Sequence, residues 1–185
     1  MSRVSCVFRR WAAWRQAVRI LAVLVPASSG VLHAEPFRAA VFDFEFLDSS
    51  QEGEAFGRRA DETARIRAAS EELRRLLAER GITPVDLAPA AARIDKAGSV
   101  THCNGCEVDI ARDLGADLAV TGLIQKISNL ILYFYVYVRD ARTGALLRAA
   151  RVDIRSNSDE SWRRGVGYLV RNRLLDPPLQ ASKAP

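Results

Sequence analysis

A ten-residue segment with alternating side chains restricts the fold of this chain more than any other feature. In residues 130–139, aromatic and β-branched side chains alternate in the pattern of Tyr133, Phe134, Tyr135, Val136, Tyr137 and Val138. Such alternation is typical of a strand with two different faces. The turn sequence 140–144 ends in glycine, and 146–154 is again rich in apolar residues, which predicts the antiparallel partner strand of a hairpin. The chain must therefore contain a β-sheet.

The other segments alternate between strand and helix patterns. We expect strands at 38–47, 82–87 and 117–124, and helices at 61–80, 89–97, 107–114 and from Ser158 through Trp162 to about 174. A polar loop is expected at 48–61. The predicted order is β-α-β-α-α-β-β-β-α. This order indicates an α+β (mixed α/β) fold with a single mixed β-sheet of about five strands and helices packed against it.

The first 34 residues have the arrangement of a cleavable secretory signal peptide. Five arginines and no carboxylate precede an apolar stretch, Ile20–Val25, and small residues then lead to Ala34. The apolar stretch is well short of the roughly 20 residues that a membrane-spanning helix needs. We expect cleavage after Ala34, with a cut after Gly30 as the alternative. Both cuts predict export to the periplasm.

Removal of this leader changes the charge of the chain. The sequence has 27 basic and 22 acidic residues, and residues 1–34 contain five of the basic ones and none of the acidic ones. The mature chain is then neutral, which removes the case for a nucleic-acid partner. We expect one periplasmic domain over 35–185, with its core at about 38–175 and a tail at 176–185. No stable membrane span is expected after cleavage.

Cys103 and Cys106 form a Cys-x-x-Cys motif at the start of an expected helix. In an oxidising compartment, such a pair forms a structural disulfide, holds a metal or takes part in thiol exchange. A helix start can stabilise a thiolate, which supports the exchange alternative. For a metal, the available ligands are Cys103, Cys106, His102, Glu107 and Asp109. The expected set is His102, Cys103 and Cys106, and copper or zinc would suit sulfur and imidazole. All three alternatives stay open, and no other cofactor is predicted.

Two sets of side chains share a strand face in the predicted pattern. The carboxylates of Asp43 and Glu45 are expected on one face of the first strand, where solvation or pairing with arginines explains them better than acid–base chemistry does. Tyr133, Tyr135 and Tyr137 also point to one side of their strand. They are core residues if the closing helix covers that side, and a surface for a protein partner if it is open.

Motifs of common enzymes are absent from the sequence. It has no Walker A loop, dinucleotide fingerprint, nucleophile elbow or His-Glu-x-x-His motif. His102 is the one histidine that follows the leader, so a Ser-His-Asp arrangement would have to use a ring next to Cys103. We therefore expect a protein that is not an enzyme.

Four short segments resemble a known family. They read AVFDFEF at 40–46, CNGCE at 103–107, GADLAVTG at 115–122 and RSNSDESW at 155–162. Over essentially the whole mature chain, the sequence resembles the uncharacterised proteobacterial periplasmic family DUF3280, also labelled DUF2380. More distantly, the first strand, the GAD segment and the D-x-x-T-G hairpin are similar to the amino-terminal domain of TolB and to CsgG-like and lipoprotein-activator domains.

The resemblance implies a TolB amino-terminal-like fold and an envelope protein that acts by binding other proteins. We therefore expect a non-enzymatic periplasmic binding or assembly protein whose partner is an envelope or periplasmic protein. The alternative is a thiol-redox or metal-handling protein that uses Cys103 and Cys106. These two functions stay open at the level of the sequence.

Overall fold

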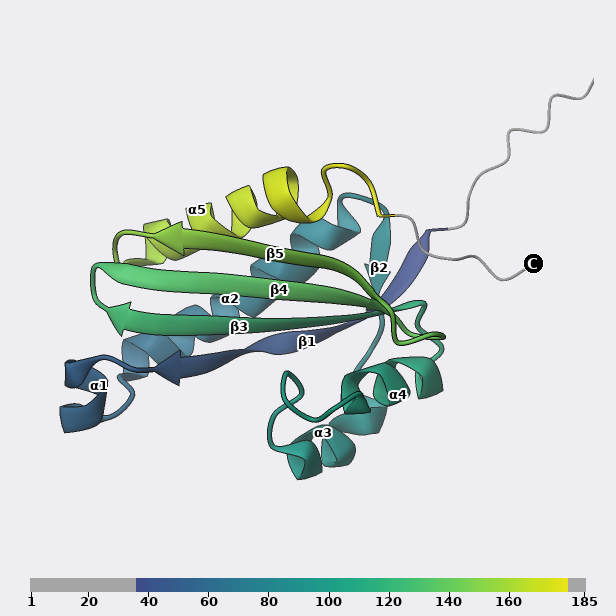
Figure 1. Cartoon of the computed structure of the whole chain (residues 1–185), viewed down its shortest axis with the longest axis horizontal. Coiled ribbons are helices and arrows are strands. Elements are labelled where there is room, and N and C mark those ends of the chain that lie inside the picture. The colour runs from purple at the N-terminus through teal and green to yellow at the C-terminus, as the bar shows by residue number, and fades with distance from the viewer. Residues whose placement is uncertain (1–35, 180–185) are drawn as a thin grey trace, which may run out of the picture. The chain divides into compact units, whose positions relative to one another are not determined.

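The computed structural model of the chain describes residues 36–179, so the expected leader and the end of the expected tail lie outside the described residues. A single sheet with the strand order β2-β1-β3-β4-β5 forms its centre (Figure 1). The strands are β1 (Phe37–Asp48), β2 (Ile82–Pro84), β3 (Leu118–Ser128), β4 (Ile131–Asp140) and β5 (Leu146–Ile154). β1 runs parallel to β2 and β3, whereas β3, β4 and β5 are antiparallel. The predicted mixed five-stranded sheet is confirmed.

Short helical segments differ more from the expectation than the strands do. The helical elements are α1 (Gln51–Phe56), α2 (Ala60–Ala78), η1 (Ala88–Ala90), α3 (Ala91–Ala97), α4 (Cys106–Asp113), α5 (Asp159–Leu169) and η2 (Val170–Leu174). The expected loop at 48–61 contains α1, because the Ser50 hydroxyl accepts a hydrogen bond from Gly53 and caps the helix. α1 buries no residue, so its sequence does not show the apolar residues at helical spacing by which a helix is predicted.

The second strand is also shorter than expected. It ends at Pro84, whereas the sequence pattern predicted a strand at 82–87. The Asp86 carboxylate accepts a hydrogen bond from the Ala88 amide and so begins the turn into η1. A capping side chain therefore ends the extended segment early.

One face of the sheet carries the larger core. There, α2 packs on β1 and β2, and α5 packs on β5 and β4; the alternate β4 residues Leu132, Phe134, Val136 and Val138 lie in the same core. The Trp162 ring of α5 lies edge-on to Phe134, with ring centroids 5.3 Å apart. Each such large apolar side chain stabilises the fold by about 1.5–3 kcal/mol on burial. The closing helix therefore covers the face of β4 opposite its tyrosines.

The second face is only partly covered. α4 packs on β1 and β3, with Val108 and Ile110 against Phe42 and Ala119 in a smaller core. Figure 1 shows α3 and α4 at one end of the sheet, and no helix in front of the remaining length of β3, β4 and β5. The candidate partner surface lies on this uncovered part of the sheet.

Gly122 allows β3 to approach the core ring of Phe44. A Cβ atom at Gly122 would lie 2.4 Å from two atoms of that ring. We expect Gly122→Ala to lower the free energy of unfolding by about 1–3 kcal/mol, because a well-packed core cannot accept the extra carbon without strain. Urea denaturation measures the loss. If the ring is the cause, Gly122→Ala should cost less in a Phe44→Leu background; equal costs in both backgrounds would contradict this account.

Candidate functional site

The cysteine motif lies in the loop between α3 and α4. Cys103 and Cys106 are joined by a disulfide, with their Cα atoms 5.5 Å apart, and Cys106 is the first residue of α4. Asn104 and Gly105 between them both have positive φ angles, 55° and 107°. Glycine and asparagine adopt this backbone conformation at low cost, which is why an Asn-Gly pair can form this tight turn.

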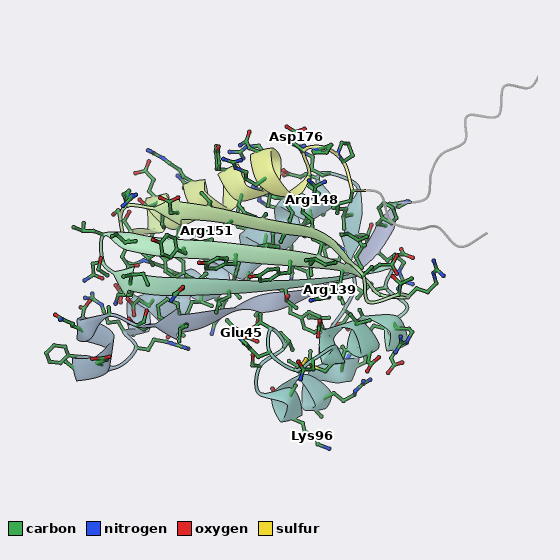
Figure 2. All side chains as sticks on the ribbon, viewed as in Figure 1. Glu45, Lys96, Arg139, Arg148, Arg151 and Asp176 are labelled. Atoms are coloured by element: carbon green, nitrogen blue, oxygen red, sulfur yellow. A yellow bond between two sulfur atoms is a disulfide. The ribbon has the colours of Figure 1, made fainter. Side chains whose placement is uncertain are left out.

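Glu45 of β1 holds the front of this loop in place. Its carboxylate accepts hydrogen bonds from the amides of Val100 and Thr101, at 2.6 and 3.1 Å, and from the Ser99 hydroxyl at 2.8 Å. Figure 2 shows Glu45 between the sheet and the α3–α4 layer. His102 lies on the same loop, with Nδ1 2.9 Å from the Thr101 hydroxyl. The carboxylate of Glu45 therefore has a structural role in positioning the motif.

Asp43 and Glu45 do not share a face as the alternation predicted. Asp43 forms an ion pair with Arg74 of α2 at 2.5 Å, whereas Glu45 binds the loop that leads to α4. The register of β1 against β3 shifts between Val41 and Phe44, and this irregularity breaks the alternation of side chains. The two carboxylates are thus separate structural contacts.

Glu107 is the buried polar group nearest to the cysteines. One of its carboxylate oxygens lies 3.3 Å from the Cys103 sulfur, and the other lies 3.3 Å from Arg139 Nε. Possible ligand atoms of Cys103, Cys106 and Glu107 all lie within 4.8 Å of one another. This group differs from the predicted ligand set, because it contains Glu107 in place of His102. Its two sulfurs are available to a metal only when the disulfide is reduced.

A hollow of about 550 Å³ separates this motif from the turn between β4 and β5. His102, Asn104, Arg112, Arg139, Arg142 and Thr143 are among its lining residues. Burial alone would raise the pKa of Asp140 in this turn, but hydrogen bonds from the Thr143 backbone and side chain and from the Arg142 amide outweigh it and lower that pKa. Two segments that are about 35 residues apart in the sequence, CNGCE and D-x-x-T-G, therefore line one hollow.

The three predicted tyrosines lie on the uncovered face of the sheet. Tyr133, Tyr135 and Tyr137 are each partly exposed, while the β4 residues between them are buried. Across the strands, Tyr135 is paired with Leu123 of β3 and Arg151 of β5. The Arg151 guanidinium lies 4.2 Å from the centroid of the Tyr133 ring and 5.6 Å from that of Tyr135. We call Leu123, Tyr133, Tyr135, Tyr137 and Arg151 the tyrosine face.

A known protein family matches most of the described part of the chain. The profile of the family described as a protein of unknown function, DUF3280 (DUF2380), matches residues 37–174, from the start of β1 to the end of η2. The chain belongs to this family. The predicted resemblance to DUF3280 is thereby confirmed.

The chain is similar to several solved bacterial structures, and no curated protein matches it. One is the LpoB C-terminal domain from Salmonella enterica, at 17% identity and a TM-score of 0.46, covering 66% of this chain and 84% of that chain. Another is the PelC dodecamer from Paraburkholderia phytofirmans, at 12% identity and a TM-score of 0.45, covering 80% and 92%. No role is assigned to the DUF3280 chain from these similarities.

The DUF3280 fold also contains a buried charge cluster that the sequence analysis missed. Lys126 of β3 is 1% exposed, and its ammonium group lies 2.7 Å from Glu62, 3.1 Å from Asp48 and 3.2 Å from Glu52. We call these four residues the Lys126 cluster. They come from β1, α1, α2 and β3, so the cluster joins one end of the sheet to two helices. Lys126 lies two residues after the buried Ile124, on the same face of β3. A charged residue at such a core position is the sequence feature that could have revealed the cluster.

Asn157 connects the Lys126 cluster to α5. Its amide group donates to Glu62 at 2.9 Å, and its carbonyl oxygen accepts from the Trp162 indole at 2.9 Å. Ser158 caps α5, with its hydroxyl accepting from the Ser161 amide, at the position where the sequence predicted the start of this helix. The RSNSDESW segment therefore has a structural explanation in the start of α5.

Acidification is expected to weaken the Lys126 cluster. Burial would raise the pKa of Asp48, but hydrogen bonds from Ser50 and Lys126 outweigh burial and lower that pKa. A carboxyl with a lowered pKa stabilises the fold above its unfolded pKa and loses this contribution as the pH falls through its folded pKa. The midpoint of thermal unfolding should thus stay level from about pH 5 to 8 and fall below about pH 4. An Asp48→Asn variant with an equally steep acid fall would contradict this assignment.

Within residues 36–179, no helix has the length and apolar character needed to cross a membrane.

Proposed function

We propose that this protein is a non-enzymatic binding or assembly protein of the periplasm, and that it docks an envelope protein on its tyrosine face. One observation carries this proposal: three partly exposed tyrosines lie side by side on a sheet surface that α2 and α5 leave uncovered. Tyrosine and arginine are enriched at protein interfaces and at the residues that dominate binding energy.

The chemistry of the tyrosine face supports binding of a protein. The rings are fixed by their strand and by the stack of Arg151 on Tyr133 and Tyr135, so little conformational entropy is lost on docking. Each phenol offers an apolar ring and a polar hydroxyl, which suits a surface that is wet when free and dry when bound. The export leader proposed for residues 1–34 would deliver this surface to the periplasm.

A tyrosine footprint tests this proposal inside one molecule. The chain has four tyrosines, and the fourth, Tyr168, is exposed on α5. We expect tetranitromethane to nitrate Tyr133, Tyr135 and Tyr137 at least threefold more slowly in intact cells than in the purified protein. Tyr168 should be slowed less than these three. Equal rates for all four tyrosines would refute docking on the tyrosine face.

A second function is favoured by one specific observation, the grouping of Cys103, Cys106 and Glu107. Two thiolates and a carboxylate supply three ligands of the type that zinc accepts, and the sulfurs suit copper in its soft form. We propose as the alternative that the reduced protein handles such a metal or exchanges disulfides. Glu107 would then either complete the ligand set or accept a proton from Cys103.

Metal titration separates the two possible ligand sets. If the grouped residues bind zinc, we expect Glu107→Gln to weaken zinc binding by the reduced protein about tenfold, because one charged ligand is lost. His102→Ala should leave affinity unchanged. Zinc titration of the reduced protein measures both affinities, while elemental analysis and thiol counting before and after reduction give the metal content and the state of the cysteines. A reduced protein that binds no zinc or copper, and whose disulfide does not exchange with a small dithiol, would remove this alternative.

A further inference from the structure

An arginine-lined hollow lies at the outer edge of the sheet, next to β5. Arg148, Arg151, Asn172, Arg173 and Asp176 line a space of about 370 Å³ between β5 and the end of η2. Figure 2 shows Arg148, Arg151 and Asp176 on this side of the sheet. We call this space the arginine hollow. Its lining includes three guanidinium groups and a single carboxylate.

The charges of the arginine hollow are not balanced within the described part of the chain. Over residues 36–179, none of these three arginines forms an ion pair. The Arg148 guanidinium donates to the Pro177 carbonyl oxygen at 2.8 Å, while its buried Nε finds no acceptor in the same residue range. A buried donor without an acceptor costs stability, so this geometry is better suited to a bound state.

The edge strand beside the hollow indicates what kind of ligand supplies the missing charge. Among residues 36–179, β5 is the last strand of the sheet and has β4 as its one hydrogen-bonded neighbour. The backbone groups on the outer side of an edge strand can pair with an added extended peptide. Guanidinium groups bind carboxylates in a planar, two-bond geometry. An extended peptide with acidic side chains satisfies both features at once.

We propose that the arginine hollow binds carboxylate side chains of an extended, acidic segment of the partner protein, which pairs with the free edge of β5. This inference rests on the proposed function and specifies its partner. Arg151 belongs to both surfaces, because it lines the hollow and stacks on two rings of the tyrosine face. The two surfaces are therefore continuous, and a single partner can contact both.

Binding of a defined peptide tests the acidic-segment proposal. The probe is a fluorescein-labelled octapeptide in which Glu and Thr alternate, and its matched control has Gln at each Glu position. In fluorescence anisotropy with the purified exported protein, we expect at least tenfold tighter binding of the Glu peptide. Arg173→Gln, an exposed change that preserves the core, should weaken binding about fivefold, and Arg148→Gln with Arg173→Gln more than tenfold. Arg67→Gln, an exposed change on α2, should have no effect.

Four outcomes would overturn this inference. Equal binding of the Glu and Gln peptides would exclude recognition of carboxylates, and equal loss in Arg67→Gln would exclude the arginine hollow as the site. Inorganic phosphate that displaces the peptide at equal concentration would identify a site for free oxyanions in place of a peptide. If the Glu peptide fails to bind while the nitration footprint on Tyr133, Tyr135 and Tyr137 is observed, this inference fails and the proposed function stands.

Discussion

Lys126→Met is expected to lower the free energy of unfolding by about 3–5 kcal/mol, the usual cost of removing one partner of a buried ion pair. Glu62 is fully buried and Asp48 is mostly buried, so both carboxylates would lose their positive partner inside the protein. Methionine keeps most of the volume of lysine, so the expected loss comes from charge and not from a cavity.

Urea denaturation at pH 7 measures the loss of stability in Lys126→Met. Arg75→Gln is the control, because it also removes a cation that bridges carboxylates, those of Glu72 and Glu79, but on the exposed side of α2. It should cost less than about 1 kcal/mol, as exposed ion pairs do. A cost for Lys126→Met below about 1 kcal/mol would show that the Lys126 cluster does not hold β1, α2 and β3 together as described.

The second large effect is expected on binding. Tyr135→Asp should weaken the complex with the envelope partner at least 30-fold, equivalent to about 2 kcal/mol, because Tyr135 lies at the centre of the tyrosine face. The change would place a carboxylate between Leu123 and Arg151, its cross-strand neighbours. Burying that charge against an apolar surface of the partner adds to the loss of the ring.

Affinity purification from cross-linked envelopes measures the effect of Tyr135→Asp, with recovery of the partner as the readout. Arg67→Asp is the control, since it adds a carboxylate at an exposed position on α2. It should leave recovery unchanged. Tyr135→Phe should keep most of the binding, because the ring remains. Equal recovery with Tyr135→Asp and with the unchanged protein would contradict the assigned surface.

Local patterns were sufficient to predict most of the sheet. The alternation at 130–139 and the turn that follows it predicted the hairpin of β4 and β5 to within a residue or two at each end. Such patterns reflect which side of a strand is buried, and a few neighbouring residues contain that information. The side on which α5 packs could not be predicted, because it depends on contacts between distant elements.

The Lys126 cluster shows why contacts between distant elements were missed. Lys126 and Glu62 are 64 residues apart, and nothing in the sequence around either residue identifies the other as its partner. The same applies to the arginine hollow, where residues of β5 meet two residues of η2 and Asp176, which follows it. Folding brings together charges that appear unrelated in the sequence, so only the register of the sheet and the packing of helices reveal them.

Photo-cross-linking in intact cells tests the central claim most directly. Benzoylphenylalanine replaces Tyr135 on the tyrosine face, Tyr168 on α5 or Arg67 on α2, one position at a time. The tyrosine-face account predicts a cross-linked envelope protein from position 135, a weaker cross-link or none from position 168, and none from position 67. Cross-links to the same protein from 168 or 67 but not from 135 would contradict it, and so would the absence of any cross-link at 135.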